Sequence, residues 1–181
     1  TIEYRELDLP DMARIKTQAL QQLDPHSPAV LSVDLFSTDF KQAFDVFDPA
    51  RPLVLISEGL INYFNPAMLL QLLQAICVYG QGFKELHYLT DIYPEPVKHK
   101  LAKLIWSSSK LLKWISRSAF GFHFTQPQQA QDFFKQAGFE KVSVIQPQQY
   151  LPHSTLPLSL SEQHLGDLVW MIHAQLKNSA D

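Results

Sequence analysis

Two kinds of hydrophobic pattern alternate along the chain. Short apolar runs of the kind found in strands occupy residues 2–7, 29–33, 53–57 and 85–90. Segments of helical periodicity lie between them, over residues 10–23, 38–47 and 66–79, with proline at the first helical position at Pro10 and Pro66 and Asn65 as an N-cap. Because the strand runs are continuously apolar, they predict a largely parallel sheet covered by helices on both faces.

The last third of the chain has a different pattern. Residues 95–117 predict an amphipathic helix with six Lys or Arg and one Glu, within an inserted segment, residues 95–126, that could cover a site. The alternative is an ordinary solvated helix face with an apolar underside. A further helix over 128–137 ends at Gly138, and two final strands are predicted at 142–145 and 168–172, joined by a long proline-containing loop.

Composition agrees with one globular domain over the 181 residues, since 46% are hydrophobic, 18% are charged and the net charge is −3. The chain has no apolar run long enough for a membrane span, so none is predicted. It starts at Thr1, inside a strand-like run, which predicts that upstream sequence is missing. Cys77 is the only cysteine and lies in an apolar stretch, so we expect a buried structural thiol and a reducing, cytoplasmic compartment.

Acidic residues stand at the ends of four predicted strands, at Asp8, Asp34, Glu58 and Asp91. In open α/β sheets, ligands bind beyond the carboxyl ends of the strands. Four carboxylates there would create a negative potential that suits a ligand with hydroxyls, an amine or a cation and repels phosphate. The alternative is that each acid only caps the helix that follows its strand.

Two cofactors are recognised by an acid at such a strand end. A dinucleotide also needs a Gly-rich turn for its pyrophosphate, whereas S-adenosylmethionine carries no phosphate and adds an ammonium and a sulfonium. The chain has only six glycines and no G-x-G-x-x-G. The acidic sheet edge therefore favours S-adenosylmethionine.

Three sequence blocks make this expectation more specific. They are Tyr4-x-Glu6-x-Asp8-Leu9-Pro10 with Lys16 following, Ser32-Val33-Asp34-Leu35, and Ser57-Glu58-Gly59-Leu60-Ile61-Asn62-Tyr63-Phe64. Together, over about residues 1–65, the chain resembles the leucine carboxyl methyltransferase family, which includes bacterial relatives acting in polyketide O-methylation. The stretch 137–140 (AGFE) is also similar to the last helix-to-strand turn of many methyltransferases.

The resemblance implies a single α/β domain with a Rossmann-like class I methyltransferase sheet. That sheet is mostly parallel with an antiparallel last strand and has helices on both faces. Two departures from the family stand out. Its Gly-rich turn after the first strand is absent, and so are an arginine and a lysine before that turn, so the first strand itself is expected upstream of Thr1. The family also often has Leu-Met-Tyr where this chain has Ile61-Asn62-Tyr63.

The resemblance also implies roles in binding S-adenosylmethionine. Asp8 would bind the ribose hydroxyls with Glu6 in support. Asp34 would accept a hydrogen bond from the adenine amino group, and Leu35 would pack on the ring. Glu58 would face the methionyl part.

The methyl acceptor is expected to meet four residues, Asn62, Tyr63, Asp91 and Tyr93, with Tyr63 near the transfer site by the same resemblance. Asp91 could act as a base or could simply start the next segment, and Asn62 could instead cap or turn toward solvent. A carboxylate on a small molecule or peptide end is favoured, because it is already ionised at neutral pH and needs no base. A hydroxyl acceptor stays open.

Other classes of protein are disfavoured. The seven histidines show no H-x-x-x-H spacing, so no metal site is predicted. Ser57 is not in a G-x-S-x-G motif, which argues against a serine hydrolase. The negative net charge gives no support to nucleic-acid binding. The rival hypothesis is a non-catalytic fragment or degenerate homologue that only binds a partner, and the sequence leaves the oligomeric state open.

Overall fold

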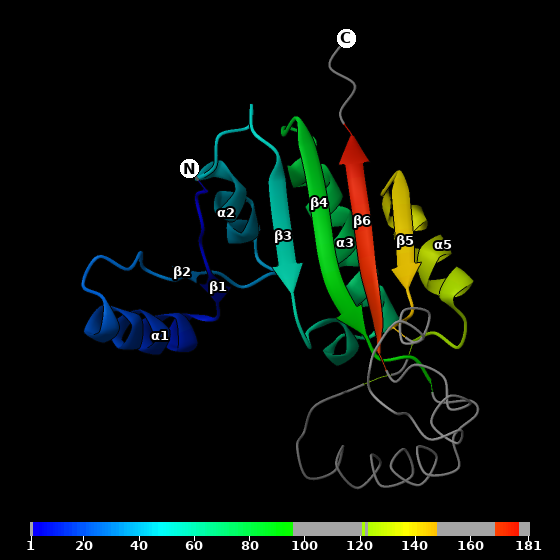
Figure 1. Ribbon diagram of the computed structural model, residues 1–181, viewed down its shortest axis with the longest axis horizontal. Coiled ribbons are helices and arrows are strands. Elements are labelled where there is room, and N and C mark those ends of the chain that lie inside the picture. The colour runs from blue at the N-terminus through cyan, green and yellow to red at the C-terminus, as the bar shows by residue number, and fades with distance from the viewer. Residues whose placement is uncertain (1, 96–120, 122, 148–168, 178–181) are drawn as a thin grey trace, which may run out of the picture. The chain divides into compact units, whose positions relative to one another are not determined.

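A computed structural model describes residues 2–95, 121, 123–147 and 169–177 of the chain (Figure 1). The chain divides into two compact units, Thr1–Arg51 and Pro52–Asp181. Each unit has its own sheet, and the two are described separately below.

The first unit contains two short parallel strands and three helical segments. In chain order these are β1 (Leu7–Asp8), α1 (Pro10–Leu23), β2 (Leu31–Ser32), the 3₁₀ helix η1 (Thr38–Lys41) and α2 (Gln42–Asp45). The bounds of α1 agree with the sequence prediction, and the predicted helix over 38–47 is present but begins as a 3₁₀ turn. Both strands are shorter than predicted, since β1 and β2 pair over only two residues each.

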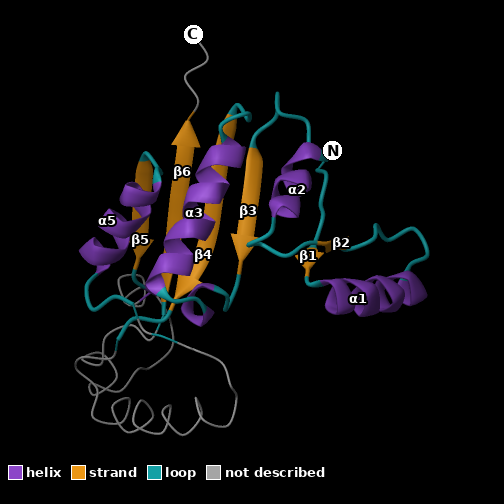
Figure 2. Cartoon of the chain, turned by 180° about the vertical axis from the view of Figure 1, so that it is seen from behind, coloured by secondary structure: helices purple, strands orange, loops and turns teal. Residues whose placement is uncertain are grey.

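The second unit is built on a four-stranded sheet (Figures 1 and 2). Its elements are β3 (Leu53–Ser57), the 3₁₀ helix η2 (Ile61–Tyr63), α3 (Pro66–Gly80), β4 (Glu85–Ile92), α5 (Pro127–Ala137), β5 (Lys141–Ile145) and β6 (Trp170–Lys177). The strand order is β3-β4-β6-β5. Strands β3 and β4 are parallel, and β6 is antiparallel to both β4 and β5. The last strand is therefore antiparallel, as predicted.

The core of the second unit lies between the sheet and the helices α3 and α5, which cover one of its faces (Figure 2). Tyr88 of β4 points into this layer, where its ring stacks against Phe134 and Phe139 at centroid distances of 6.3 and 6.2 Å. Phe134 is fully buried, and burying such a side chain contributes about 1.5–3 kcal/mol. The opposite face of the sheet exposes apolar side chains, including Val54 (50%) and Ile56 (74%) on β3.

Two residues that the sequence predicts at helix ends in the second unit are found there. Asn65 caps α3 by accepting a hydrogen bond from Met68 N at 2.9 Å. Gly138 follows α5 with φ of +122°, a conformation that L side chains rarely adopt, and a Cβ there would lie 3.3 Å from Cys77 Sγ. Cys77 is buried, which confirms the prediction of a structural thiol, and burial raises its pKa to about 12. A thiol with that pKa stays protonated and unreactive at neutral pH.

The structure corrects the predicted bounds of the last strand, and other predictions concern residues that it does not describe. The last strand was predicted at 168–172, but β6 runs from Trp170 to Lys177. It extends further because all eight of its residues pair with the eight residues of β4. Most of the predicted helix over 95–117 and of the insertion over 95–126 lies outside the described residues, as does most of the loop before β6.

Candidate functional site

The predicted acids of the first unit lie at one edge of its sheet. Asp8 is the last residue of β1, and Asp34 follows β2 by two residues. Since β1 and β2 are parallel, both acids belong to the carboxyl edge. Asp8 Oδ1 accepts a hydrogen bond from Leu9 N at 2.9 Å, and Asp34 Oδ1 accepts one from Phe36 N at the same distance. These bonds hold each carboxylate against its own turn.

Lys16 joins the two acids of the first strand segment. Its Nζ lies 3.0 Å from Glu6 Oε2 and 3.3 Å from Asp8 Oδ2. The hydrogen bond from Lys16 lowers the pKa of Glu6, and the same contact raises the pKa of Lys16. Glu6 therefore stays ionised over the neutral range, and its pairing with Lys16 is lost as the pH falls through the lowered pKa. The sequence placed Lys16 in the motif but assigned it no role.

We expect Lys16→Gln to raise the pKa of Glu6 toward its ordinary value, because the substitution removes the ammonium that favours the ionised carboxylate. A carboxyl ¹³C NMR titration measures this directly. Lys41→Gln is the matched control, since Lys41 pairs at 2.7 Å with Asp45 on exposed surface of the same unit. An unchanged Glu6 pKa in Lys16→Gln, or an equal rise in the control, would contradict the role of this lysine.

The acids of the second unit lie at the carboxyl ends of β3 and β4. Glu58 directly follows β3 and is exposed. Asp91 is 8% exposed, and its Oδ1 accepts a hydrogen bond from Gly59 N at 2.7 Å. Gly59 has φ of +64°, which favours glycine at this turn. Asp91 therefore fixes the turn that carries Glu58. It lies within β4, so the alternative that it starts the next segment is wrong.

Three further predicted residues lie in or next to the 3₁₀ turn η2: Asn62 and Tyr63 belong to it, and Tyr93 is hydrogen-bonded to it. Asn62 is 2% exposed, so the alternative that it turns toward solvent is wrong. Its side chain donates to Tyr93 O and Gly121 O and accepts from Tyr93 N. Tyr63 and Tyr93 are 50% and 37% exposed. The two tyrosines are thus accessible, whereas the Asn62 side chain is bound to main-chain atoms.

The alternative that the four acids are only helix caps is wrong for the helical segments that follow three of them. In the described structure, α1 has Leu9 at its N-cap, η1 has Ser37 and η2 has Leu60. The side chains of Asp8, Asp34 and Glu58 therefore cap none of these elements. Asp8 and Asp34 instead accept hydrogen bonds from main-chain N–H groups of the turns that follow their strands.

The predicted residues fall into two groups, one in each unit. The first unit holds four of them (Glu6, Asp8, Asp34 and the partly buried Leu35), and the second holds the other five (Glu58, Asn62, Tyr63, Asp91 and Tyr93). In the second unit the structure brings Glu58 near Asp91, which is distant in sequence, because Gly59, the residue after Glu58, donates its main-chain N–H to Asp91 Oδ1. That all four strand-end acids surround one ligand stays a prediction.

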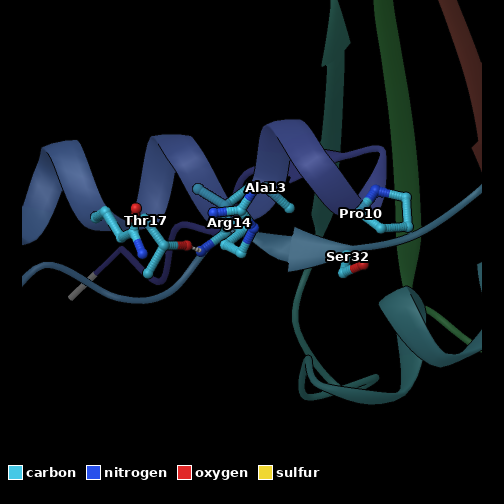
Figure 3. Close-up of a pocket in the computed structure, with 7 residues that line it drawn as sticks. Pro10, Ala13, Arg14, Thr17 and Ser32 are labelled. Atoms are coloured by element: carbon cyan, nitrogen blue, oxygen red, sulfur yellow. Dashed lines mark hydrogen bonds between the residues drawn. The ribbon is translucent and has the colours of Figure 1, made fainter.

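An open groove of about 350 Å³ lies between α1 and β2 in the first unit (Figure 3). Pro10, Ala13, Arg14, Thr17 and Ser32 are among its lining residues. Thr17 Oγ1 accepts a hydrogen bond from Val30 N at 2.9 Å, which ties the helix to the chain before β2. The lining includes none of the predicted site residues, so the groove is distinct from the acidic edge.

No helix in the part of the chain that the structure describes is both long and apolar enough to cross a membrane. No group of three or more His, Cys, Asp or Glu side chains in the same part is arranged to hold a metal ion.

Comparison with known proteins relates the chain to methyltransferases. The family model described as leucine carboxyl methyltransferase matches residues 1–77. This match contains the three sequence blocks on which the resemblance rests. No curated protein matches the chain in sequence.

Solved structures share the fold at low sequence identity. One is a putative methyltransferase from Thermobifida fusca, with 17% identity, a TM-score of 0.58, and coverage of 94% of this chain and 62% of that one. Another is a putative O-methyltransferase from Nostoc punctiforme, with 14% identity, a TM-score of 0.54, and coverage of 94% and 43%. A third is human N-acetylserotonin methyltransferase in complex with SAM, with 14% identity, a TM-score of 0.51, and coverage of 94% and 39%.

The chain thus spans less than two thirds of the length of each of these neighbours. At these identities the likeness concerns the fold. The protein has the class I methyltransferase fold, and its resemblance to the leucine carboxyl methyltransferase family is confirmed over residues 1–77.

Proposed function

We propose that this protein is an S-adenosylmethionine-dependent O-methyltransferase that acts on a carboxylate or hydroxyl of a small molecule or peptide. The observation that carries the proposal is the set of acids at the carboxyl ends of both parallel strand pairs. Asp8 and Asp34 stand there in the first unit, and Glu58 and Asp91 in the second. Asp8, Asp34 and Glu58 cap no described helix, which supports a role in binding a ligand beside the turn contacts of Asp8 and Asp34.

The carboxylate acceptors of the first unit suit the hydroxyl and amino donors of the sugar and base of this cofactor. Asp8 would accept hydrogen bonds from the ribose hydroxyls, and Glu6 would support it through their shared partner Lys16. Asp34 is exposed and has only its Oδ1 engaged with Phe36 N among the bonds described, so it suits an amino-group donor such as adenine. The partly buried Leu35 would pack on the adenine ring.

Residues of the second unit would bind the methionyl end of S-adenosylmethionine, which carries the reacting methyl group. Glu58 is exposed beyond β3 and would attract the cationic methionyl part, which carries an ammonium and a sulfonium. S-adenosylmethionine supplies a methyl group already activated by the sulfonium. The protein then mainly contributes proximity and alignment of the acceptor. Tyr63 and Tyr93 are the accessible residues near η2 that would contact the acceptor.

A carboxylate acceptor is favoured over a hydroxyl. A hydroxyl needs a base, but Asp91, the candidate base, is buried and already accepts a hydrogen bond from Gly59 N. A carboxylate is ionised at neutral pH and needs no such group. The single buried Cys77 also agrees with a reducing compartment, for which we propose the cytoplasm.

The test is transfer of labelled methyl from S-adenosylmethionine to two probes, 4-hydroxybenzoate, which offers a carboxylate and a phenol, and a short peptide with a free carboxyl end. We expect labelled product that releases methanol in mild alkali, because a methyl ester hydrolyses there and an aryl ether does not. Label that resists alkali would overturn the carboxylate assignment. A protein that neither binds S-adenosylmethionine nor transfers its methyl would support the rival hypothesis of a non-catalytic binding module.

A further inference from the structure

Asn62 makes an unusual set of contacts for a residue on a short 3₁₀ turn. Its Nδ2 donates to Tyr93 O at 3.0 Å and to Gly121 O at 2.7 Å. Its Oδ1 accepts from Tyr93 N at 2.9 Å, and its main-chain O accepts from Gly121 N at 2.7 Å. One buried side chain thus connects three chain segments: η2, the end of β4 and the chain at residue 121.

The chemistry of these contacts is specific to asparagine. An amide side chain offers two N–H donors and one carbonyl oxygen, the same groups that a neighbouring strand would offer to Tyr93. Both Nδ2 hydrogens are used, so this nitrogen has no donor left for a ligand. Aspartate would lose both donors, and an apolar residue would remove the partly buried hydrogen bonds to Tyr93 and Gly121, which is costly.

The same contacts set the position of the two accessible tyrosines. Tyr63 follows Asn62 directly in the chain, and both main-chain polar groups of Tyr93 are bound by the Asn62 side chain. A second bond, Glu95 N to Phe124 O at 2.8 Å, joins the same two regions just beyond. The turn at Glu58 is fixed by different atoms, namely Gly59 N and Asp91 Oδ1.

We propose that Asn62 is a positioning residue for the methyl acceptor: it does not contact the acceptor but holds Tyr63 and Tyr93 in place to receive it. This inference rests on the proposed function. Because Glu58 is held independently and the other cofactor candidates belong to the first unit, Asn62 should affect the acceptor side and leave cofactor binding unchanged.

The test compares Asn62→Asp and Asn62→Leu with the control Asn65→Ala. The control removes the N-cap bond from Met68 N, three residues further along, and should lower the stability of the protein without changing the contacts of Tyr93 or Gly121. The protein is labelled with 3-fluorotyrosine, and the ¹⁹F signals of Tyr63 and Tyr93 are assigned from Tyr→Phe variants. We expect both Asn62 variants to shift the Tyr93 signal and the control to leave it in place.

Kinetics give the second measurement, with whichever of the two acceptor probes the unmodified protein methylates. We expect the KM for that probe to rise about tenfold in the Asn62 variants, since small misplacements of binding groups are costly. The Kd for S-adenosylmethionine should stay within about twofold, given that Asn62 binds only main chain.

The possible failures are distinguishable. A protein that binds S-adenosylmethionine but shows an unshifted Tyr93 signal in Asn62→Leu overturns the positioning role. So does a shift of equal size in Asn65→Ala, which would mean that the signal reports stability alone. Absence of S-adenosylmethionine binding by the unmodified protein contradicts the proposed function itself.

Discussion

Replacing Asp8 with alanine is expected to weaken the binding of S-adenosylmethionine by about 10- to 150-fold. A hydrogen bond to a charged group contributes about 1.5–3 kcal/mol, which corresponds to that change in affinity. Asp8 ends β1, is only partly exposed and caps no helix in the described structure. Its carboxylate is held by Leu9 N and Lys16, so it is oriented before any ligand arrives.

Isothermal titration calorimetry of the unmodified protein, Asp8→Ala and Asp11→Ala measures this effect. Asp11 is the matched control, since it lies three residues away in the first turn of α1 and its side chain is 94% exposed. Both variants remove one negative charge, so any difference between them reports the specific contact rather than net charge. Equal affinity in Asp8→Ala and the unmodified protein would refute the ribose role.

A polypeptide of residues 1–181 alone is expected to self-associate and to lack a single cooperative melting transition. The reason is that we propose a further strand that completes the sheet structure of the protein. The described strands form two sheets, β1-β2 and β3-β4-β6-β5. A pair of two-residue strands is marginal in water by itself. Strand β3 pairs on one side only among the described strands and exposes Val54 and Ile56. Such an edge is a template for association with other chains.

Light scattering and differential scanning calorimetry test this expectation. We expect self-association and a broad transition, and we expect Ile56→Lys to reduce the association because a charge blunts the open edge. Val46→Lys is the control, since Val46 is 43% exposed but lies outside any strand. A monodisperse protein with a single sharp melting transition would contradict the proposal that a further strand completes the sheet.

Local patterns in the sequence were sufficient for most elements. The helix α1 has the predicted bounds, and α3 and α5 begin within one residue of theirs, because proline, an N-cap residue or a following glycine marks their ends. The bounds of β3 also agree with its apolar run. Helices depend on hydrogen bonds between near neighbours in the chain, so their signals are contained in a short stretch of sequence.

The strands whose partners are distant were predicted less well. The runs at 2–7 and 29–33 pair over two residues each, and β6 runs five residues beyond its predicted end. Strand length depends on which other strand is available to complete the ladder, and that partner is not encoded locally. The extent of β6 follows from its full pairing with β4, which lies about 85 residues earlier in the chain.

The same division holds for the candidate site. The sequence alone determined that acids stand at strand ends and that residues 1–65 resemble a methyltransferase family. Only the tertiary structure decided what those acids contact: that Lys16 binds Glu6 and Asp8, and that Asp91 holds the Glu58 turn through Gly59. It also decided that Asn62 is buried against Tyr93 and Gly121, 31 and 59 residues away. A motif specifies which groups are present, but hydrogen-bond partners distant in sequence are set by how the strands and turns pack.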